Sequence, residues 1–167
     1  PSGYAAIGQF QNAVQMITTC ASGAINTGVT KYTAEYNDKK DEQHALWRAA
    51  GSIAFIGSAI TTILIIIFSR ELAATFLKDE KLSGVFVWFG LTLVFFIFNT
   101  LLLSILNGKK EIHKYVLANI SGSVFSLFIT SILTLTYGLY GALVSLAVYQ
   151  SLSFFVTFII CHKSEWF

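Results

Sequence analysis

The chain has 167 residues, of which 54% are hydrophobic and only 12% are charged, and its mean hydropathy is +0.65. Average soluble domains carry about 25% charged residues, so this composition argues against a domain that folds in water. The net charge of +2 is too small to indicate nucleic-acid binding. Cys20 and Cys161 lie in or beside apolar runs, and we interpret them as small buried hydrophobic residues without a disulfide.

The sequence begins with Pro1, and its one methionine lies well inside it. We therefore expect the chain to be a piece of a longer protein. No basic and apolar leader with a cleavage site, the pattern of a signal peptide, is recognisable.

Five apolar spans follow one another along the chain, and residues 49–69, 82–108 and 115–162 contain no Asp, Glu, Lys or Arg. A helix of about 20 apolar residues crosses the hydrocarbon core of a membrane, whereas strands of membrane barrels are about 10 residues long and alternate in polarity. The sequence therefore predicts an all-α polytopic membrane protein, a single bundle over residues 1–167 with five transmembrane helices. The predicted spans cover about residues 5–36, 46–69, 85–106, 112–136 and 139–161.

The loops between the spans differ in their basic residues. Alternate loops share one side of the membrane, which groups residues 31–48, residues 107–115 and the C-terminal tail. The opposite side holds only Arg70, Lys78 and Lys81 of the 11 basic residues. The positive-inside rule then places the first group in the cytoplasm and the N-terminus outside.

Two connections have patterns of their own. Residues 70–83 mix charges with Leu72, Phe76 and Leu77, which fits a short interfacial helix or an ordinary amphipathic loop. The sequence Tyr-Gly-Leu-Tyr-Gly at residues 137–141 predicts a tight turn at the membrane interface, because glycine permits the turn and tyrosine prefers the headgroup region.

The first span carries a polar stripe with helical spacing. Placed on one continuous α-helix, its members fall within an arc of about 80°, while Phe10, Val14, Ile17 and Ala21 lie on the other side. Polar amides do not face lipid, so the stripe faces protein or water. In one interpretation it hydrogen-bonds and packs against neighbouring helices. In the other, which we favour because the stripe is longer than helix packing generally needs, it lines a hydrated cavity for a polar solute. The stripe consists of Gly8, Asn12, Gln15, Thr19, Ser22, Asn26 and Thr30.

Lys31 and Arg48 bracket the first cytoplasmic loop. They fit either interfacial anchors that follow the positive-inside rule or a pair of cations that holds an anionic headgroup at the cavity mouth. Single amides at Asn99, Asn119 and Gln150 are interpreted as ties between helices rather than ligand-binding groups.

The sequence offers no catalytic residues and no metal or cofactor site. No Asp or Glu lies in the middle of a span, where proton or sodium relays ordinarily place one. The three histidines lie in loops without metal-ligand spacing. We therefore expect a protein that is not an enzyme.

Three segments resemble Wzx-type flippases of the polysaccharide transport family, the translocases of O-antigen and enterobacterial common antigen (lipid III). Gly3-Tyr-Ala-Ala-Ile-Gly-Gln-Phe-Gln-Asn12 and Gly23-Ala-Ile-Asn-Thr-Gly-Val-Thr-Lys-Tyr32 are similar to the family's second transmembrane helix, and the Asn107-Gly-Lys-Lys110 turn is similar as well. The resemblance implies the multidrug/oligosaccharidyl-lipid/polysaccharide exporter superfamily, whose members have 12 or more helices in two lobes. The five spans would then be helices 2–6 of the first lobe.

The resemblance also implies a function. Such proteins move an oligosaccharide on undecaprenyl diphosphate from the cytoplasmic to the periplasmic leaflet of the bacterial inner membrane by alternating access. Membrane lipids and other polysaccharide-assembly membrane proteins are the expected partners. The substrate-binding candidates are Asn12, Gln15, Thr19, Ser22, Asn26 and Thr30 for the sugars, with Lys31 and Arg48 for the diphosphate.

Three other functions stay open. A drug or cation extruder of the same superfamily would favour carboxylates inside the membrane, and the five spans have none. A membrane glycosyltransferase or polymerase would need a large external loop, whereas the longest external segment is residues 70–83. A non-transporting scaffold subunit would use the polar stripe for packing only.

Overall fold

The computed structural model describes residues 3–22 and 25–164, and no strand occurs among them. The all-α prediction is therefore confirmed for these residues. The elements are α1 (Gly3–Ser22), α2 (Ile25–Glu35), α3 (Lys40–Ile67), α4 (Ser69–Leu72), the π-helix η1 (Ala73–Leu77), the 3₁₀-helix η2 (Glu80–Leu82), α5 (Ser83–Gly108) and α6 (Ile112–His162).

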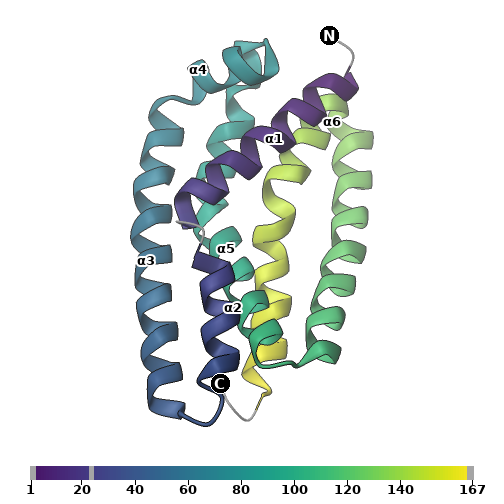
Figure 1. Cartoon of the computed structure of the whole chain (residues 1–167). Helices are drawn as coiled ribbons and strands as arrows, with labels where there is room; N and C mark the ends of the chain where they lie inside the picture. Colours follow the sequence, from purple (N-terminus) through teal and green to yellow (C-terminus); the bar gives the residue numbers. More distant parts are fainter. Residues whose placement is uncertain (1–2, 23–24, 165–167) are drawn as a thin grey trace.

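The described residues of the first predicted span form helices α1 and α2, and residues 23 and 24 between them lie outside the described residues. Helix α1 ends at Ser22 and α2 begins at Ile25, and Figure 1 shows α1 inclined to α2. The prediction of one continuous helical face over this span is therefore wrong. The physical reason is that a constant 100° per residue describes one straight helix axis, whereas α1 and α2 have differently directed axes (Figure 1).

Helix α6 doubles back on itself. Gly138 has φ +57° and ψ −134° inside it, and Figure 1 shows the parts before and after this residue running side by side in opposite directions. A side chain at Gly141 would collide with the carbonyl oxygen of Leu133, so the two glycines permit this close reversal. The predicted turn at residues 137–141 is confirmed.

Three helices in the described residues are long and apolar enough to cross a membrane: α3, α5 together with η2, and α6. Their lengths are 28, 29 and 51 residues, compared with the roughly 20 residues that one crossing needs. The prediction of long apolar helices is thus confirmed, whereas the count of five spans stays a prediction.

Helix α5 forms the centre of the molecule. A row of its side chains is at most 1% exposed, comprising Val85, Phe86, Phe89, Leu93 and Ile97. Phe10 of α1 packs edge-on against this row, with ring centroids 5.4 Å from Phe86 and 6.3 Å from Phe89. Phe10 is completely buried, so it fixes which side of α1 faces inward.

The outer faces of α3 and α6 are apolar. Ile63 and Ile67 of α3 are 59% and 63% exposed, and Leu127 and Phe128 of α6 are 69% and 66% exposed. Apolar surfaces of this extent fit contact with acyl chains rather than water.

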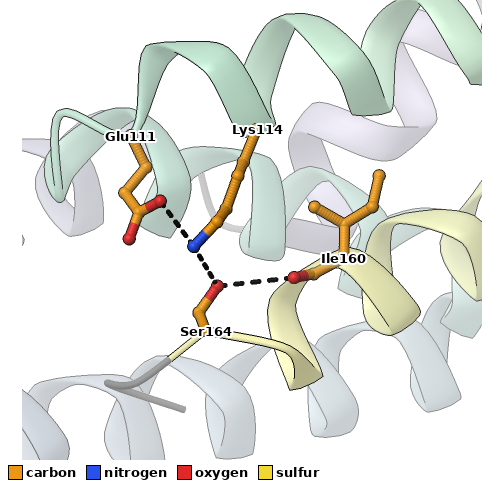
Figure 2. Close-up of polar contacts among 4 residues, drawn as sticks. All are labelled: Glu111, Lys114, Ile160 and Ser164. Carbon is orange, nitrogen blue, oxygen red and sulfur yellow. Dashed lines mark hydrogen bonds and ion pairs between the residues drawn. The ribbon is translucent and has the colours of Figure 1, made fainter.

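The predicted grouping of loops is seen at one end of the bundle, where the α2–α3 and α5–α6 connections lie beside the described C-terminal end (Figure 1). Lys109 Nζ donates to Asn37 Oδ1 at 3.3 Å and to Gln43 Oε1 at 3.2 Å, which joins two of these segments. Figure 2 shows how the start of α6 is joined to the described C-terminal end. Lys114 forms an ion pair with Glu111 at 2.7 Å and donates to Ser164 Oγ at 2.9 Å.

Residues 70–83 lie at the opposite end and are largely helical, as α4, η1 and η2 (Figure 1). Their apolar side chains point inward, because Ala73 is fully buried and Leu77 is 2% exposed. Helical structure is thus established for this connection, and its place on a membrane surface stays a prediction.

Candidate functional site

The part of the polar stripe that lies in α1 is exposed. Asn12, Gln15 and Thr19 are exposed, whereas Ala13 and Ala21 of the same helix are 0% and 2% exposed. Among the described residues, Thr19 Oγ1 donates to Gln15 O of its own helix at 2.8 Å, and Asn12 makes no side-chain hydrogen bond. The buried Phe10 explains this orientation, because the inward face of α1 is occupied by apolar contacts.

The same orientation corrects one sequence-based interpretation. Cys20 is exposed, beside Thr19 on the outward side of α1, so the prediction that it is a buried hydrophobic residue is wrong. Cys161 is buried, as predicted, and both thiols are free. The local apolar run could not indicate which residues of α1 lack a neighbouring helix.

A hollow of about 430 Å³ adjoins this face, and we call it the α1 hollow. Two predicted residues, Gln15 and Thr19, line it together with Gln11 and Thr18, which the stripe did not include. Phe96 and Tyr149 reach it from α5 and α6. Its described lining, which carries no charged side chain, is Phe10, Gln11, Val14, Gln15, Thr18, Thr19, Phe96, Leu146 and Tyr149.

The sequence analysis did not predict that Gln11, Thr18 and Tyr149 line the α1 hollow. Gln11 and Thr18 are polar and each lies one position before a stripe residue, so a wider polar arc on α1 would have included them. Tyr149 lies far along the chain, and no local pattern connects it with α1.

The lower part of the stripe packs against α5 instead. Ser22 is buried, and Thr30 Oγ1 donates to Ser104 O of α5 at 3.2 Å. The side-chain oxygen Oδ1 of Asn26 is buried and has no hydrogen-bond partner among the described residues. The two parts of the stripe therefore have different surroundings, one open and one against a neighbouring helix.

Lys31 and Arg48 line different hollows. Lys31 lies in one of about 470 Å³, the α2 hollow, whose lining is Asn26, Thr27, Thr30, Lys31, Ser104 and Asn107. Arg48 lies in another of about 510 Å³ with Gly51, Ser52, Phe55 and Ile56. Both side chains are exposed, and the Lys31 ammonium lies 5.4 Å from the centre of the Tyr32 ring. Lys31 thus shares a hollow with Asn26 and Thr30 of the predicted set, and Arg48 does not.

The intramembrane amides form a network between α5 and α6. Asn99 Nδ2 donates to Gln150 Oε1 at 2.8 Å, and Gln150 Nε2 donates to the Tyr149 hydroxyl at 3.1 Å. The prediction of interhelical ties is confirmed for Asn99 and Gln150. It is wrong for Asn119, whose Nδ2 donates to Tyr115 O within α6 at 2.8 Å, because a neighbouring carbonyl of the same helix lies within reach.

No group of three or more His, Cys, Asp or Glu side chains lies close enough to hold a metal ion in the described part of the chain. The hollows therefore supply amides, hydroxyls and aromatic rings, and the α2 hollow adds one ammonium. Amides and hydroxyls both donate and accept hydrogen bonds.

The comparison with known proteins gives the family. The model of the polysaccharide biosynthesis protein family matches residues 1–163. The chain belongs to this family. No curated protein and no solved structure matches it. Family membership together with the long apolar helices indicates a membrane protein of polysaccharide biosynthesis.

Proposed function

We propose that this chain is part of a flippase that moves an undecaprenyl-diphosphate-linked oligosaccharide, an O-antigen or common-antigen repeat unit, from the cytoplasmic to the periplasmic leaflet of the bacterial inner membrane by alternating access. The observation that carries this proposal is the exposed, uncharged polar face of α1 beside the α1 hollow. The chain belongs to a family of polysaccharide biosynthesis proteins, and this membership supports a carbohydrate cargo.

The chemistry of the α1 hollow suits a sugar. Each glutamine amide supplies two donors and an accepting oxygen, and each threonine hydroxyl donates and accepts, which matches the mixed hydrogen bonding of sugar hydroxyls. Tyr149 and Phe96 add aromatic surface for the apolar side of a sugar ring. A volume of about 430 Å³ lies within the range of small-ligand sites.

Lys31 is the stronger candidate for the diphosphate. An ammonium beside hydroxyls and amides binds phosphate oxygens by charge-assisted hydrogen bonds, and Thr30, Asn26 and Asn107 surround Lys31 in the α2 hollow. Arg48 lies in a different hollow, so we propose that it contacts the anionic headgroup separately from Lys31.

The membrane arrangement follows the same proposal. The end that carries Lys31, Lys109 and Lys114 faces the cytoplasm by the positive-inside rule. Helices α1 and α2 together form one crossing. The two parts of α6, each about 25 residues long, form one crossing each.

Thiol accessibility in the full-length protein tests the path. In a Cys20→Ser background, cysteines at Asn12, Gln15 and Thr19 should react with a small membrane-impermeant thiol reagent. The matched controls Ala13→Cys and Ala21→Cys should remain unlabelled, because these positions are buried against the bundle. Protection of all three outward positions, with either side of the membrane exposed, would show that no aqueous path follows α1.

A flipping assay tests the cargo. Proteoliposomes with the full-length protein should move the undecaprenyl-linked oligosaccharide, and Lys31→Ala should lose most of this activity while Lys31→Arg keeps much of it. Lys40→Ala removes an exposed lysine from the same end and should retain activity. Equal activity in the Lys31 variants and the parent would remove Lys31 from the substrate site.

An extruder of cationic drugs is the second candidate for the α1 hollow. It has weaker support, because the described lining contains no carboxylate to compensate a cation. Movement of a lipophilic cation by proteoliposomes that do not move the lipid-linked sugar would favour it.

A further inference from the structure

We infer that Asn99 and Gln150 are positioning residues, which make the hydroxyl of Tyr149 a hydrogen-bond donor to the cargo in the α1 hollow. The inference rests on the proposed function, because it takes a sugar as the occupant of this hollow. Tyr149 lies at a junction, since it lines the α1 hollow and also a smaller hollow of about 100 Å³ between α5 and α6. Asn99 and Gln150 line the smaller hollow and not the α1 hollow.

The three side chains form a directed chain of hydrogen bonds. Asn99 Nδ2 donates to Gln150 Oε1 at 2.8 Å, and Gln150 Nε2 donates to the Tyr149 hydroxyl oxygen at 3.1 Å. The chain begins in the core, because Asn99 is only 1% exposed. The Gln150 amide presents its nitrogen to Tyr149 while its oxygen is held by Asn99, so a buried residue of α5 fixes how Tyr149 is bonded.

This direction leaves the hydrogen of the Tyr149 hydroxyl uncommitted. A phenol hydroxyl has one hydrogen; its oxygen accepts from Gln150, and no acceptor for the hydrogen lies among the described residues. The other two hydroxyls that line the α1 hollow differ, because Thr18 Oγ1 and Thr19 Oγ1 each donate to a carbonyl oxygen of α1 at 2.8 Å. Tyr149 is therefore the only hydroxyl of the described lining that is free to donate to a ligand.

The group that such a donor recognises is a neutral acceptor oxygen of the sugar. The described lining of the α1 hollow carries no charged side chain, so a carboxylate on the cargo would lie there without compensation. Water in the smaller hollow is the competing acceptor for the Tyr149 hydrogen, because that hollow is lined by amides and hydroxyls that bind water. Cargo and water therefore predict different effects of losing the hydroxyl.

Binding of the undecaprenyl-diphosphate-linked oligosaccharide to the full-length protein in detergent tests the inference. Tyr149→Phe removes the hydroxyl and keeps the ring, so it should weaken binding about 2- to 10-fold, the loss expected for one hydrogen bond. Gln150→Met removes the donor that orients the hydroxyl and should weaken binding by a similar factor. The Tm of each variant is measured alongside, which separates loss of binding from loss of the fold.

Gln150→Glu tests the direction of the chain. A protonated carboxyl has the donor and the acceptor of an amide, whereas a carboxylate only accepts. The protonated form should therefore bind the cargo as the parent does. The ionised form takes the hydrogen of the Tyr149 hydroxyl for itself, so the affinity relative to the parent should fall as the pH rises and this carboxyl ionises.

Two controls separate the direction of the hydrogen bond from the new charge. In the double variant Tyr149→Phe with Gln150→Glu, the affinity relative to the parent should no longer depend on pH. Asn119→Asp introduces a carboxyl in the lining of the same smaller hollow but outside the chain, and it should show no pH-dependent loss. Tyr149 is the one titratable side chain in the described lining of the two hollows.

Three results would overturn the inference. Unchanged affinity in Tyr149→Phe would mean that the hydroxyl donates to water, and unchanged affinity in Gln150→Met would mean that the amide does not orient it. A pH-dependent loss that persists in the double variant would mean that charge alone weakens binding. Absence of binding by the parent protein is a different result, because it would refute the proposed cargo and this inference with it.

Discussion

Replacing Gly57 of α3 by alanine tests the contact that positions α1. A methyl group at Gly57 would collide with the carbonyl oxygen of Ala21 in α1. Ala21 is buried, with 2% of its surface exposed. The obstacle is backbone, so it cannot rotate away as a side chain would, and α1 must shift. Gly51 lies on the same helix and has nothing within 4 Å of such a methyl group, which makes Gly51→Ala the matched control.

The expected difference is the cost of overpacking. Gly→Ala in a helix interior gains up to about 1 kcal/mol from helix propensity, and an unrelieved extra methyl group costs about 1–3 kcal/mol. Gly51→Ala should therefore raise the free energy of unfolding slightly. Gly57→Ala should lower it by up to about 2 kcal/mol, which leaves the two variants about 1–3 kcal/mol apart.

Thermal unfolding of the full-length protein in detergent measures this difference. A change of 1 kcal/mol shifts Tm by about 2–4 °C for domains of 150–250 residues, so Gly57→Ala should melt several degrees below Gly51→Ala. Because α1 carries the outward polar face, Gly57→Ala should also alter thiol labelling at Thr19. Identical melting and labelling of the two variants would refute the close approach of α1 and α3.

Three further outcomes are expected from the same assay. Phe10→Ala removes a completely buried ring and should cost about 3–5 kcal/mol. A double-mutant cycle on Asn99 and Gln150 should give a coupling free energy of about 0.6 kcal/mol and at most about 1.7 kcal/mol, the range for hydrogen bonds between membrane helices. Lys109→Met should cost about 1–3 kcal/mol, because it leaves Oε1 of the 1% exposed Gln43 without its partner.

Each of these outcomes has its own control. Phe95 is 41% exposed, so Phe95→Ala should cost much less than loss of the Phe10 ring; equal costs would contradict the core described for α5. Lys110→Met removes an exposed neighbouring charge and should leave Tm nearly unchanged. Strict additivity of the two amide variants would show that Asn99 and Gln150 do not interact.

The sequence alone determined the helical class, the long apolar segments and the grouping of the loops. These properties depend on local composition: a continuous run of apolar residues must satisfy its own backbone in a helix, and basic residues gather at the cytoplasmic ends of spans. The reversal at residues 137–141 was also local, because two glycines permit it. The sequence predicted that Asn99 and Gln150 each hydrogen-bond a neighbouring helix, but it did not predict that they bond to each other.

The tertiary structure decided where the polar groups lie. The inclination of α1 to α2 separates the stripe into two parts (Figure 1), and the packing of Phe10 against α5 leaves Asn12, Gln15 and Thr19 exposed. The α1 hollow needs residues from α1, α5 and α6. Periodicity describes one helix at a time, whereas a cavity exists only where side chains from several helices leave space between them.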